Sequence, residues 1–227
     1  MMRIAILAGA VCLLASATRA ATPELTLSNG DLAYTDANGQ TRVLSHDIDS
    51  VAVGPDGHSV AMIHADQPGP PYPTSLWVAD ELTGASREVV GPHDSADPKL
   101  KFESFYGADF SPDGGTVYVT VITGEDSRTV HAVSLQAGTE RYVADGEEGG
   151  VISDGPYRGD LFVERDTPPP ISHGVGIAMY VVSPDGKVMF MVPGSDTGVQ
   201  NSGDAIRAWL TKNGWRSPSY DIPKPPQ

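Results

Sequence analysis

A short hairpin motif that recurs along the chain limits the possible folds more than any other sequence feature. Residues 53–62 have the sequence VGPDGHSVAM, residues 110–119 have FSPDGGTVYV, and a third SPDG stands at residues 183–186. Each Pro-Asp-Gly turn separates two β-rich segments, because proline presets φ, aspartate hydrogen-bonds its own backbone and glycine accepts a positive φ. Hairpins repeated at intervals of tens of residues are typical of propellers and related repeat sheets. The sequence therefore predicts a repeat fold built of β-hairpins.

A second class of turn sets the length of the repeat. It follows a β-rich segment, precedes a shorter one, and recurs about every 45–55 residues, close to the period of a four-stranded propeller blade. Its four copies are Asn38-Gly39, Thr83-Gly84, Ala137-Gly138 and Asp185-Gly186. On this register these turns join strands c and d of each blade, whereas the first two Pro-Asp-Gly turns join strands a and b. The third SPDG is then a c–d turn, and residues 155–159 form the a–b turn of the last blade.

The chain is therefore predicted to be all-β, a small or incomplete β-propeller of about four blades and about fifteen strands with a short C-terminal helix. Full blades are expected at residues 48–91, 105–145 and 150–194, and residues 25–45 have room for only three strands. Glycines at the turns are predicted to have positive φ. These are Gly57, Gly84, Gly114, Gly138 and Gly186.

The C-terminal stretch has a different pattern. Ile206, Trp209 and Leu210 fall on one face of a helix predicted at about residues 203–213, and a proline-rich tail follows. The short first unit leaves a strand edge open, and native proteins cover or pair such edges. We expect the C-terminal helix to cover this edge. The alternative is that a partner adds a strand there by β-augmentation.

Two stretches of the chain resemble the TolB-type β-propeller repeat. They are FSPDG at residues 110–114, and LWVAD at residues 76–80 with the following Thr83-Gly84 turn. The resemblance covers about three-quarters of the chain after the leader and is specific for the type of repeat. It implies a propeller fold, and it allows either a periplasmic scaffold or a propeller domain associated with a peptidase. The family usually forms six or more blades, whereas this chain has three full units and a partial fourth.

The first twenty residues have the pattern of a secretory signal peptide. A positive start that includes Arg3 precedes an apolar stretch at residues 4–14, and small residues allow cleavage after Ala17 or Ala20. We therefore divide the chain into a signal peptide at 1–20, a propeller domain at 21–200 and a C-terminal helix and tail at 201–227. The apolar stretch is shorter than the ~20 residues of a bilayer span. Export to the periplasm or beyond is predicted, without a transmembrane segment in the mature chain.

The charge of the chain excludes two classes of partner. The net charge is −14, and it becomes −16 once cleavage removes Arg3 and Arg19. Nucleic acids and anionic membranes select for clustered Lys and Arg. No such cluster is found, so neither is expected as a partner. The only cysteine, Cys12, lies in the predicted leader, so the mature fold has to rely on its hydrophobic core.

The sequence contains no pattern that is typical of a catalytic or metal site. The string at residues 57–61, GHSVA, lacks the second glycine of a nucleophile elbow and lies on a predicted hairpin. None of the His-Asp pairs has the spacing of a zinc site, and His64 is expected to be a hydrogen-bonded, half-buried residue. No cofactor is therefore predicted. Calcium at the loop carboxylates of Asp154 or Asp196 is the one alternative.

Four aromatic residues in or beside predicted loops are candidates for partner binding: Tyr72, Phe105, Tyr106 and Tyr157. Two hypotheses for the function follow. The first is a non-enzymatic exported scaffold, a monomer or weak oligomer, that binds a protein or peptide through one rim or an open blade edge. The second is a propeller that binds a small ligand or a metal, with or without hydrolytic activity. The missing catalytic triad, zinc spacing and phosphate loop favour the first.

Overall fold

The computed structural model describes residues 23–66, 74–122, 127–167, 176–193, 195, 208–209 and 211–213. These residues form four antiparallel sheets with fifteen strands, and β-structure dominates as predicted. Sheet 1 contains β1 (Glu24–Ser28), β2 (Asp31–Thr35) and β3 (Thr41–Ser45). Sheet 2 contains β4 (Ile48–Val53), β5 (Ser59–Ala65), β6 (Thr74–Asp80) and β7 (Ser86–Val90).

The next two sheets repeat the same up-and-down order. Sheet 3 contains β8 (Ser104–Phe110), β9 (Thr116–Ile122), β10 (Arg128–Ser134) and β11 (Glu140–Asp145), and a short 3-10 helix, η1 (Pro98–Leu100), precedes it. Sheet 4 contains β12 (Glu147–Val151), β13 (Leu161–Thr167), β14 (Gly176–Val182) and β15 (Val188–Met191). The predicted blades and the three-stranded first unit are confirmed. The third SPDG does form a c–d turn, between β14 and β15.

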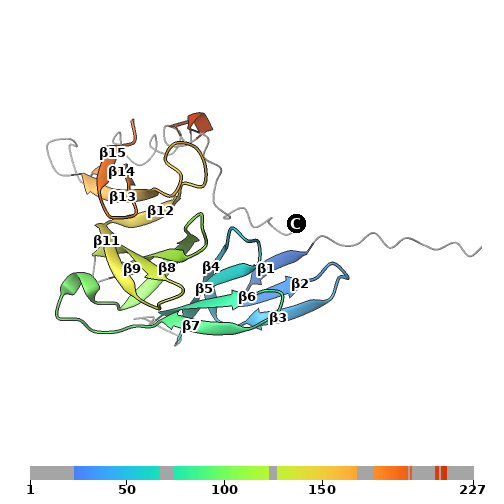
Figure 1. Cartoon of the computed structure of the whole chain (residues 1–227). Helices are drawn as coiled ribbons and strands as arrows, with labels where there is room; N and C mark the ends of the chain where they lie inside the picture. The colour runs from blue at the N-terminus through green and yellow to red at the C-terminus, as the bar shows by residue number, and fades with distance from the viewer. Residues whose placement is uncertain are drawn as a thin grey trace, which may run out of the picture.

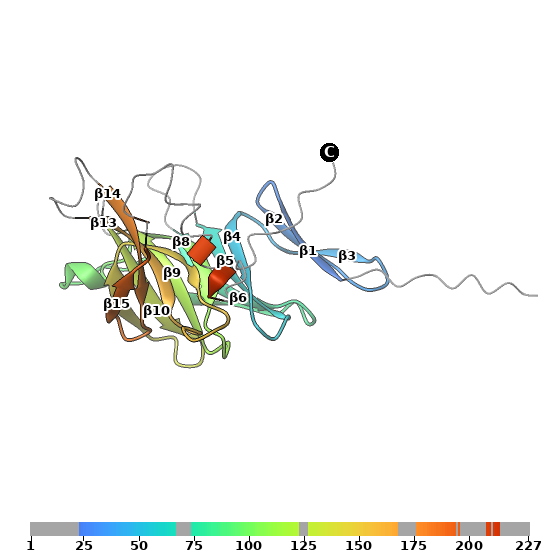
Figure 2. The same cartoon turned by 90° about the horizontal axis from the view of Figure 1, so that it is seen from above.

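The four sheets follow one another in chain order along an arc. In Figure 1 and in the perpendicular view of Figure 2, sheet 1 lies at one end and sheet 4 at the other. Hydrophobic clusters of the described residues join sheet 1 to sheet 2, sheet 2 to sheet 3, and sheet 3 to sheet 4. None of these clusters joins sheet 4 back to sheet 1. The described part of the chain is therefore an open segment of a propeller.

Strand β9 shows how consecutive sheets are held together. Val117, Val119 and Val121 alternate along one face and are fully buried in the cluster shared with sheet 2. Tyr118 points the other way and belongs to the cluster shared with sheet 4. A strand in the middle of a blade is thus buried on both faces, which explains its dense run of β-branched and aromatic residues.

The five glycines predicted at turns all have positive φ, between 63° and 87°. The c–d turn glycine of each later sheet also lies against the outer strand of the preceding sheet. A Cβ atom on Gly138 would lie 3.9 Å from the Val89 carbonyl oxygen, and a Cβ atom on Gly186 would overlap the Val143 carbonyl oxygen. At Gly39, the equivalent glycine of sheet 1, a Cβ atom would meet nothing within 4 Å. Among the residues that the structure describes, sheet 1 is therefore the first of the arc.

The two ends of the arc differ in surface chemistry. On sheet 1, the face away from the core carries small and mostly polar residues, such as Thr26, Ala33 and Thr35. On sheet 4, the outer cluster contains Phe162 and Val181, and Trp209 packs against it. A polar outer face is what a terminal repeat needs in order to face water, whereas an apolar face needs a cover.

The expected position of the C-terminal helix is wrong for its described part. Residues 208–209 and 211–212 are helical, and the Trp209 ring lies 5.5 Å from Phe190 and 5.9 Å from Phe162, between ring centroids. Trp209 therefore covers sheet 4 and not the open edge of sheet 1. The physical reason is that the aromatic face to be covered is on sheet 4. Ile206, Leu210 and the rest of the predicted helix lie outside the described residues.

Candidate functional site

A cavity of about 680 Å³ lies at one rim of the arc, between sheets 3 and 4. Such a volume is within the range of ligand pockets in proteins. Its wall is formed by the ends of β9 and β10, the connection from β11 to β12, the C-terminal part of β13 and the residues before β8. It is lined by Pro98, Lys99, Ile122, Ser127, Arg128, Thr129, Asp145, Gly146, Glu147, Glu164, Arg165, Asp166 and Ile177.

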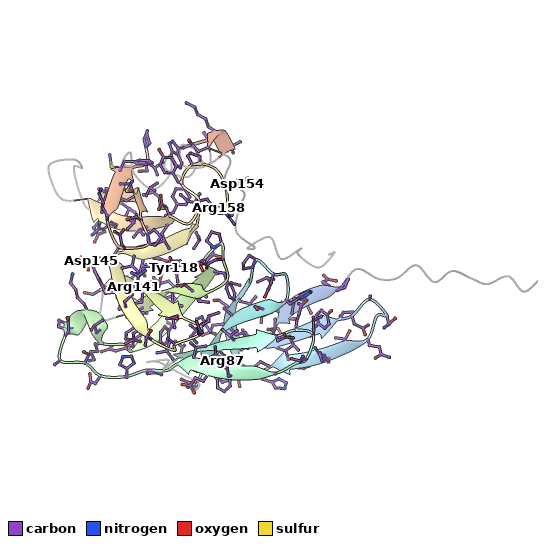
Figure 3. The ribbon with its side chains drawn as sticks, in the orientation of Figure 1. Arg87, Tyr118, Arg141, Asp145, Asp154 and Arg158 are labelled. Carbon is purple, nitrogen blue, oxygen red and sulfur yellow. The ribbon has the colours of Figure 1, made fainter. Side chains whose placement is uncertain are left out.

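Gly146 lets the chain pass from sheet 3 to sheet 4 at the wall of the cavity. Its φ is +120°, and a Cβ atom there would overlap the Glu164 carbonyl oxygen. Its amide donates to the Arg128 carbonyl oxygen at 2.8 Å. Only glycine combines this backbone conformation with so close an approach. As a result, Asp145 and Glu147 are held on either side of the crossing, and Figure 3 shows Asp145 at the boundary between the two sheets.

Two arginines facing the cavity are held in the same way, by a tyrosine ring and a carboxylate. The Arg128 guanidinium lies 5.3 Å from the centroid of the Tyr106 ring and donates to Glu147. The Arg165 guanidinium lies 5.8 Å from the centroid of the Tyr180 ring, and its Nη2 is 3.9 Å from Asp145 Oδ2. Guanidinium groups are suited to this combination of stacking and ion pairing.

Lys99 completes the second of these clusters from η1. Its Nζ lies 3.7 Å from Asp145 Oδ1 and 4.3 Å from the centroid of the Tyr142 ring. The hydrogen bond with Tyr142 and the charge of Asp145 raise the pKa of Lys99 above its usual value. Asp145 thus has two cations beside it, Lys99 and Arg165.

Glu164 is in a different situation. It lies directly opposite Glu147 in the β12–β13 ladder, and like charges in that position destabilise a sheet. Burial, with the charge of Glu147 added, raises the pKa of Glu164. Among the described residues no cation forms an ion pair with Glu164, because the nearby Arg128 is engaged with Glu147.

Of the four aromatic residues predicted to bind a partner, the three that the structure describes are not exposed. Tyr106 is half-buried beside the cavity; its hydroxyl oxygen is buried and has no hydrogen-bond partner among the described residues. Burial and the neighbouring Glu147 raise the pKa of Tyr106. Tyr157 is half-buried and packs against Trp209, and Tyr72 lies outside the described residues.

Phe105 has to be corrected. It is 2% exposed and belongs to the core between sheets 2 and 3, where its ring centroid lies 5.3 Å from that of Phe102. Its position at the start of β8 suggested a loop residue, but the strand already begins at Ser104. The side chain faces the core and is not available to a partner.

Sequence reasoning missed the charged residues of the cavity. The signal was present in two segments, DGEE at residues 145–148 and ERD at residues 164–166. In the predicted register the first follows strand d of one blade and the second ends strand b of the next, and both points lie at the same rim. Charged residues at strand ends are common on protein surfaces. Only the predicted strand register indicates that these two segments lie close together.

Other candidate groups are placed as follows. His64 is half-buried, with Nδ1 3.4 Å from Asp66 Oδ1, as expected. Asp154 accepts a hydrogen bond from the Gly155 amide at 2.7 Å, and Asp196 lies outside the described residues. In the part of the chain that the structure describes, no three His, Cys, Asp or Glu residues are grouped to hold a metal. Nor does that part contain a helix long and apolar enough to span a bilayer.

A hydroxyl–imidazole pair on β10 could suggest a nucleophile and its base. Thr129 Oγ1 lies 3.0 Å from His131 Nε2. However, Thr129 is 4% exposed and His131 is completely buried. The histidine ring packs edge-on against Phe102, which is the arrangement of a core residue. A substrate cannot reach such a base without displacing core side chains.

Comparisons with solved structures agree on the fold. A putative TolB from Agrobacterium tumefaciens has a TM-score of 0.53 and 15% identity, over 78% of this chain and 62% of that one. The tricorn protease has a TM-score of 0.52 and 17% identity, over 74% and 15% of the two chains. The β-propeller domain of the Trilobed protease from Pyrococcus furiosus, described as having an open velcro topology, has a TM-score of 0.50 and 15% identity, over 75% and 57%.

These likenesses show that the chain has a TolB-like β-propeller fold, as the sequence predicted. At such low identities they show the fold alone. The chain spans less than two-thirds of the length of each of these three structures. No family model matches the sequence, and no curated protein is significantly similar to it.

Proposed function

We propose that this protein is an exported, non-enzymatic scaffold that binds a protein or peptide partner at the charged cavity between sheets 3 and 4. The observation that carries the proposal is the cavity itself, which combines a volume of about 680 Å³ with seven charged lining residues at a rim. Loops and strand ends on a rigid β scaffold are where binding residues concentrate.

The arrangement of charges supports a binding role. The lining has positive and negative charges close together. The positive residues are Lys99, Arg128 and Arg165, and the negative residues are Asp145, Glu147, Glu164 and Asp166. A peptide carries charged groups and backbone amides that match such a surface, and electrostatic complementarity then gives specificity. The proposed export rests on the leader-like first twenty residues.

The structure leaves a second surface for the same function. Among the described residues strand β1 pairs with β2 alone, and a partner strand could pair with its other edge. We place the binding site at the cavity because the cavity offers named side chains for specificity, whereas an edge offers mainly backbone groups.

The test is a peptide-display selection on the purified chain from residue 21 onward. Enriched peptides are synthesised, and their Kd is measured with the parent and with Arg128→Glu, which reverses one charge of the lining. We expect micromolar Kd values that change at least tenfold in the variant, toward tighter binding for a peptide with a basic side chain and toward weaker binding for a peptide with an acidic one. Arg87→Glu, on sheet 2, is the matched control and should bind as the parent does. Failure to enrich any peptide, or equal binding by Arg128→Glu, would contradict the proposed site.

A further inference from the structure

We propose that the cavity binds a basic side chain, arginine or lysine, of the partner peptide, with Glu164 as its counter-ion. The inference rests on the proposed function and adds the chemical class of the ligand. Two observations carry it: the way the cavity holds its own arginines, and the position of Glu164 among other carboxylates.

The cavity already contains two arginine side chains that have the same kinds of neighbours. Arg128 is placed between the Tyr106 ring and Glu147, and Arg165 between the Tyr180 ring and Asp145. A planar cation beside an aromatic ring and a carboxylate is favourable on both counts. The site is therefore built of the groups that recognise a basic side chain.

Glu164 differs from Glu147 and Asp145 because no arginine of the described residues forms an ion pair with it. It lies opposite Glu147 across two hydrogen-bonded strands, an arrangement that is unfavourable for two negative charges. Arg128 pairs with Glu147, and among the described residues no cation pairs with Glu164. Asp166, two residues along β13 and on the same face of the strand, adds another carboxylate to the lining. A second cation entering the cavity would relieve the repulsion.

The groups around Glu164 also favour a cation over an anion. Glu147 and Asp166 lie near Glu164 in the lining, and the Tyr106 ring, which is not part of the lining, stacks with Arg128. An arginine side chain has five N–H donors in a fixed plane and can donate to two carboxylates together. An anionic ligand would instead meet Glu147 and Glu164, so a basic side chain is the better match.

The experiment measures binding of three fluorescein-labelled nonapeptides by fluorescence anisotropy. All have the sequence Gly-Ser-Gly-Ser-X-Ser-Gly-Ser-Gly, with X as arginine, lysine or citrulline, the uncharged counterpart of arginine. We expect the arginine and lysine peptides to bind at least tenfold more tightly than the citrulline peptide. Binding should weaken as salt rises, because the contact is an ion pair.

Glu164→Gln keeps the shape of the side chain and should remove most of this preference, whereas Glu88→Gln on β7, outside the cavity, should leave it unchanged. Thermal unfolding of each variant shows that it is folded. If Glu164→Gln does not fold, Asp166→Asn provides a second test, with a smaller but measurable loss of preference. Equal binding of the arginine and citrulline peptides, or no binding of any, would overturn the inference. Peptides enriched by display that bind the parent tightly without a basic residue would overturn it too, while the proposed function would stand.

Discussion

His131 is the most unusual single residue of the core. It is completely buried on β10, with its ring 4.6 Å from the Phe102 ring and 5.8 Å from the Tyr142 ring, between centroids. Nε2 is paired with the Thr129 hydroxyl, whereas Nδ1 is buried without a partner among the described residues. Burial, with a smaller contribution from His93, lowers the pKa of His131 to about 4. The folded protein therefore contains this imidazole in its neutral form.

The first prediction is a dependence of stability on pH that comes from His131. As pH falls below about 6.5, the unfolded chain binds a proton at this histidine while the folded chain does not, until pH nears 4. The free energy of unfolding should therefore fall over this range by on the order of 3 kcal/mol from this group. Urea unfolding at several pH values checks this.

The matched variants isolate this contribution from other groups that titrate in the same range. His131→Phe should flatten the pH dependence relative to the parent, since phenylalanine cannot bind a proton. Phe102→Leu changes a core ring that contacts His131 and has no titratable group, so it should leave the slope as it is. An unchanged slope in His131→Phe would show that the imidazole is not kept neutral by the fold.

The c–d turn is the element that joins one blade to the previous one. At sheet 4 its glycine, Gly186, lies directly against the backbone of β11, and at sheet 1 the equivalent Gly39 lies in open space. Both have positive φ, 87° and 77°. Both turns therefore require a residue at positive φ, and only the turn of Gly186 also contacts a neighbouring sheet.

Alanine substitution at these two glycines should separate the local cost from the tertiary one. Gly39→Ala should lower the free energy of unfolding by about 1 kcal/mol, the cost of a Cβ at positive φ. Gly186→Ala should cost about 3 kcal/mol, because the added Cβ also forces sheet 4 away from β11. Urea unfolding of both variants provides the measurement. Equal losses would mean that the two sheets do not approach as closely as the structure shows.

At the scale of the whole molecule, the described sheets form an open arc whose two ends differ in surface chemistry. Sheet 1 ends in a mostly polar face, whereas sheet 4 ends in an apolar and aromatic cluster that Trp209 covers. The rings of Tyr157, Phe162 and Phe190 all lie within 6 Å of the Trp209 ring, between centroids. Trp209 thus occupies the side of sheet 4 on which a further blade would pack in a longer propeller.

Removing Trp209 should therefore both destabilise the protein and expose an adhesive face. Trp209→Ala should lower the free energy of unfolding by about 2–3 kcal/mol, less than for a fully buried aromatic because Trp209 is half-buried. Chemical unfolding gives this value, and light scattering should detect new self-association through the exposed cluster. Lys212→Ala, on the same helical turn but exposed, is the control. A monomeric Trp209→Ala protein of unchanged stability would show that the segment is not a cover.

Much of the fold could be predicted because turn chemistry is local. Pro-Asp-Gly and Thr-Gly turns depend on a few neighbouring residues; for example, the Asp56 carboxylate accepts from the amides of His58 and Ser59. Once the turns are located, the alternation of buried residues sets each strand, and the strands group into blades. The number of strands, the short first unit and the c–d position of the third SPDG follow from this alone.

The residues of the candidate site, and the covering of sheet 4 by Trp209, could not be predicted in the same way. The sequence neighbours of Phe105 and Trp209 do not reveal what buries them. Phe105 packs with residues of sheet 2 such as Ile63, and Trp209 packs with Phe190 on sheet 4, both distant in the chain. The pairing of Glu147 with Glu164 and the stacking of Arg128 on Tyr106 likewise depend on how two blades pack. The sequence by itself determined the hairpins and their order, because those are governed by local backbone preferences. Only the tertiary structure decided which charges meet at the rim and which face is covered, because these depend on contacts between blades that no short segment specifies.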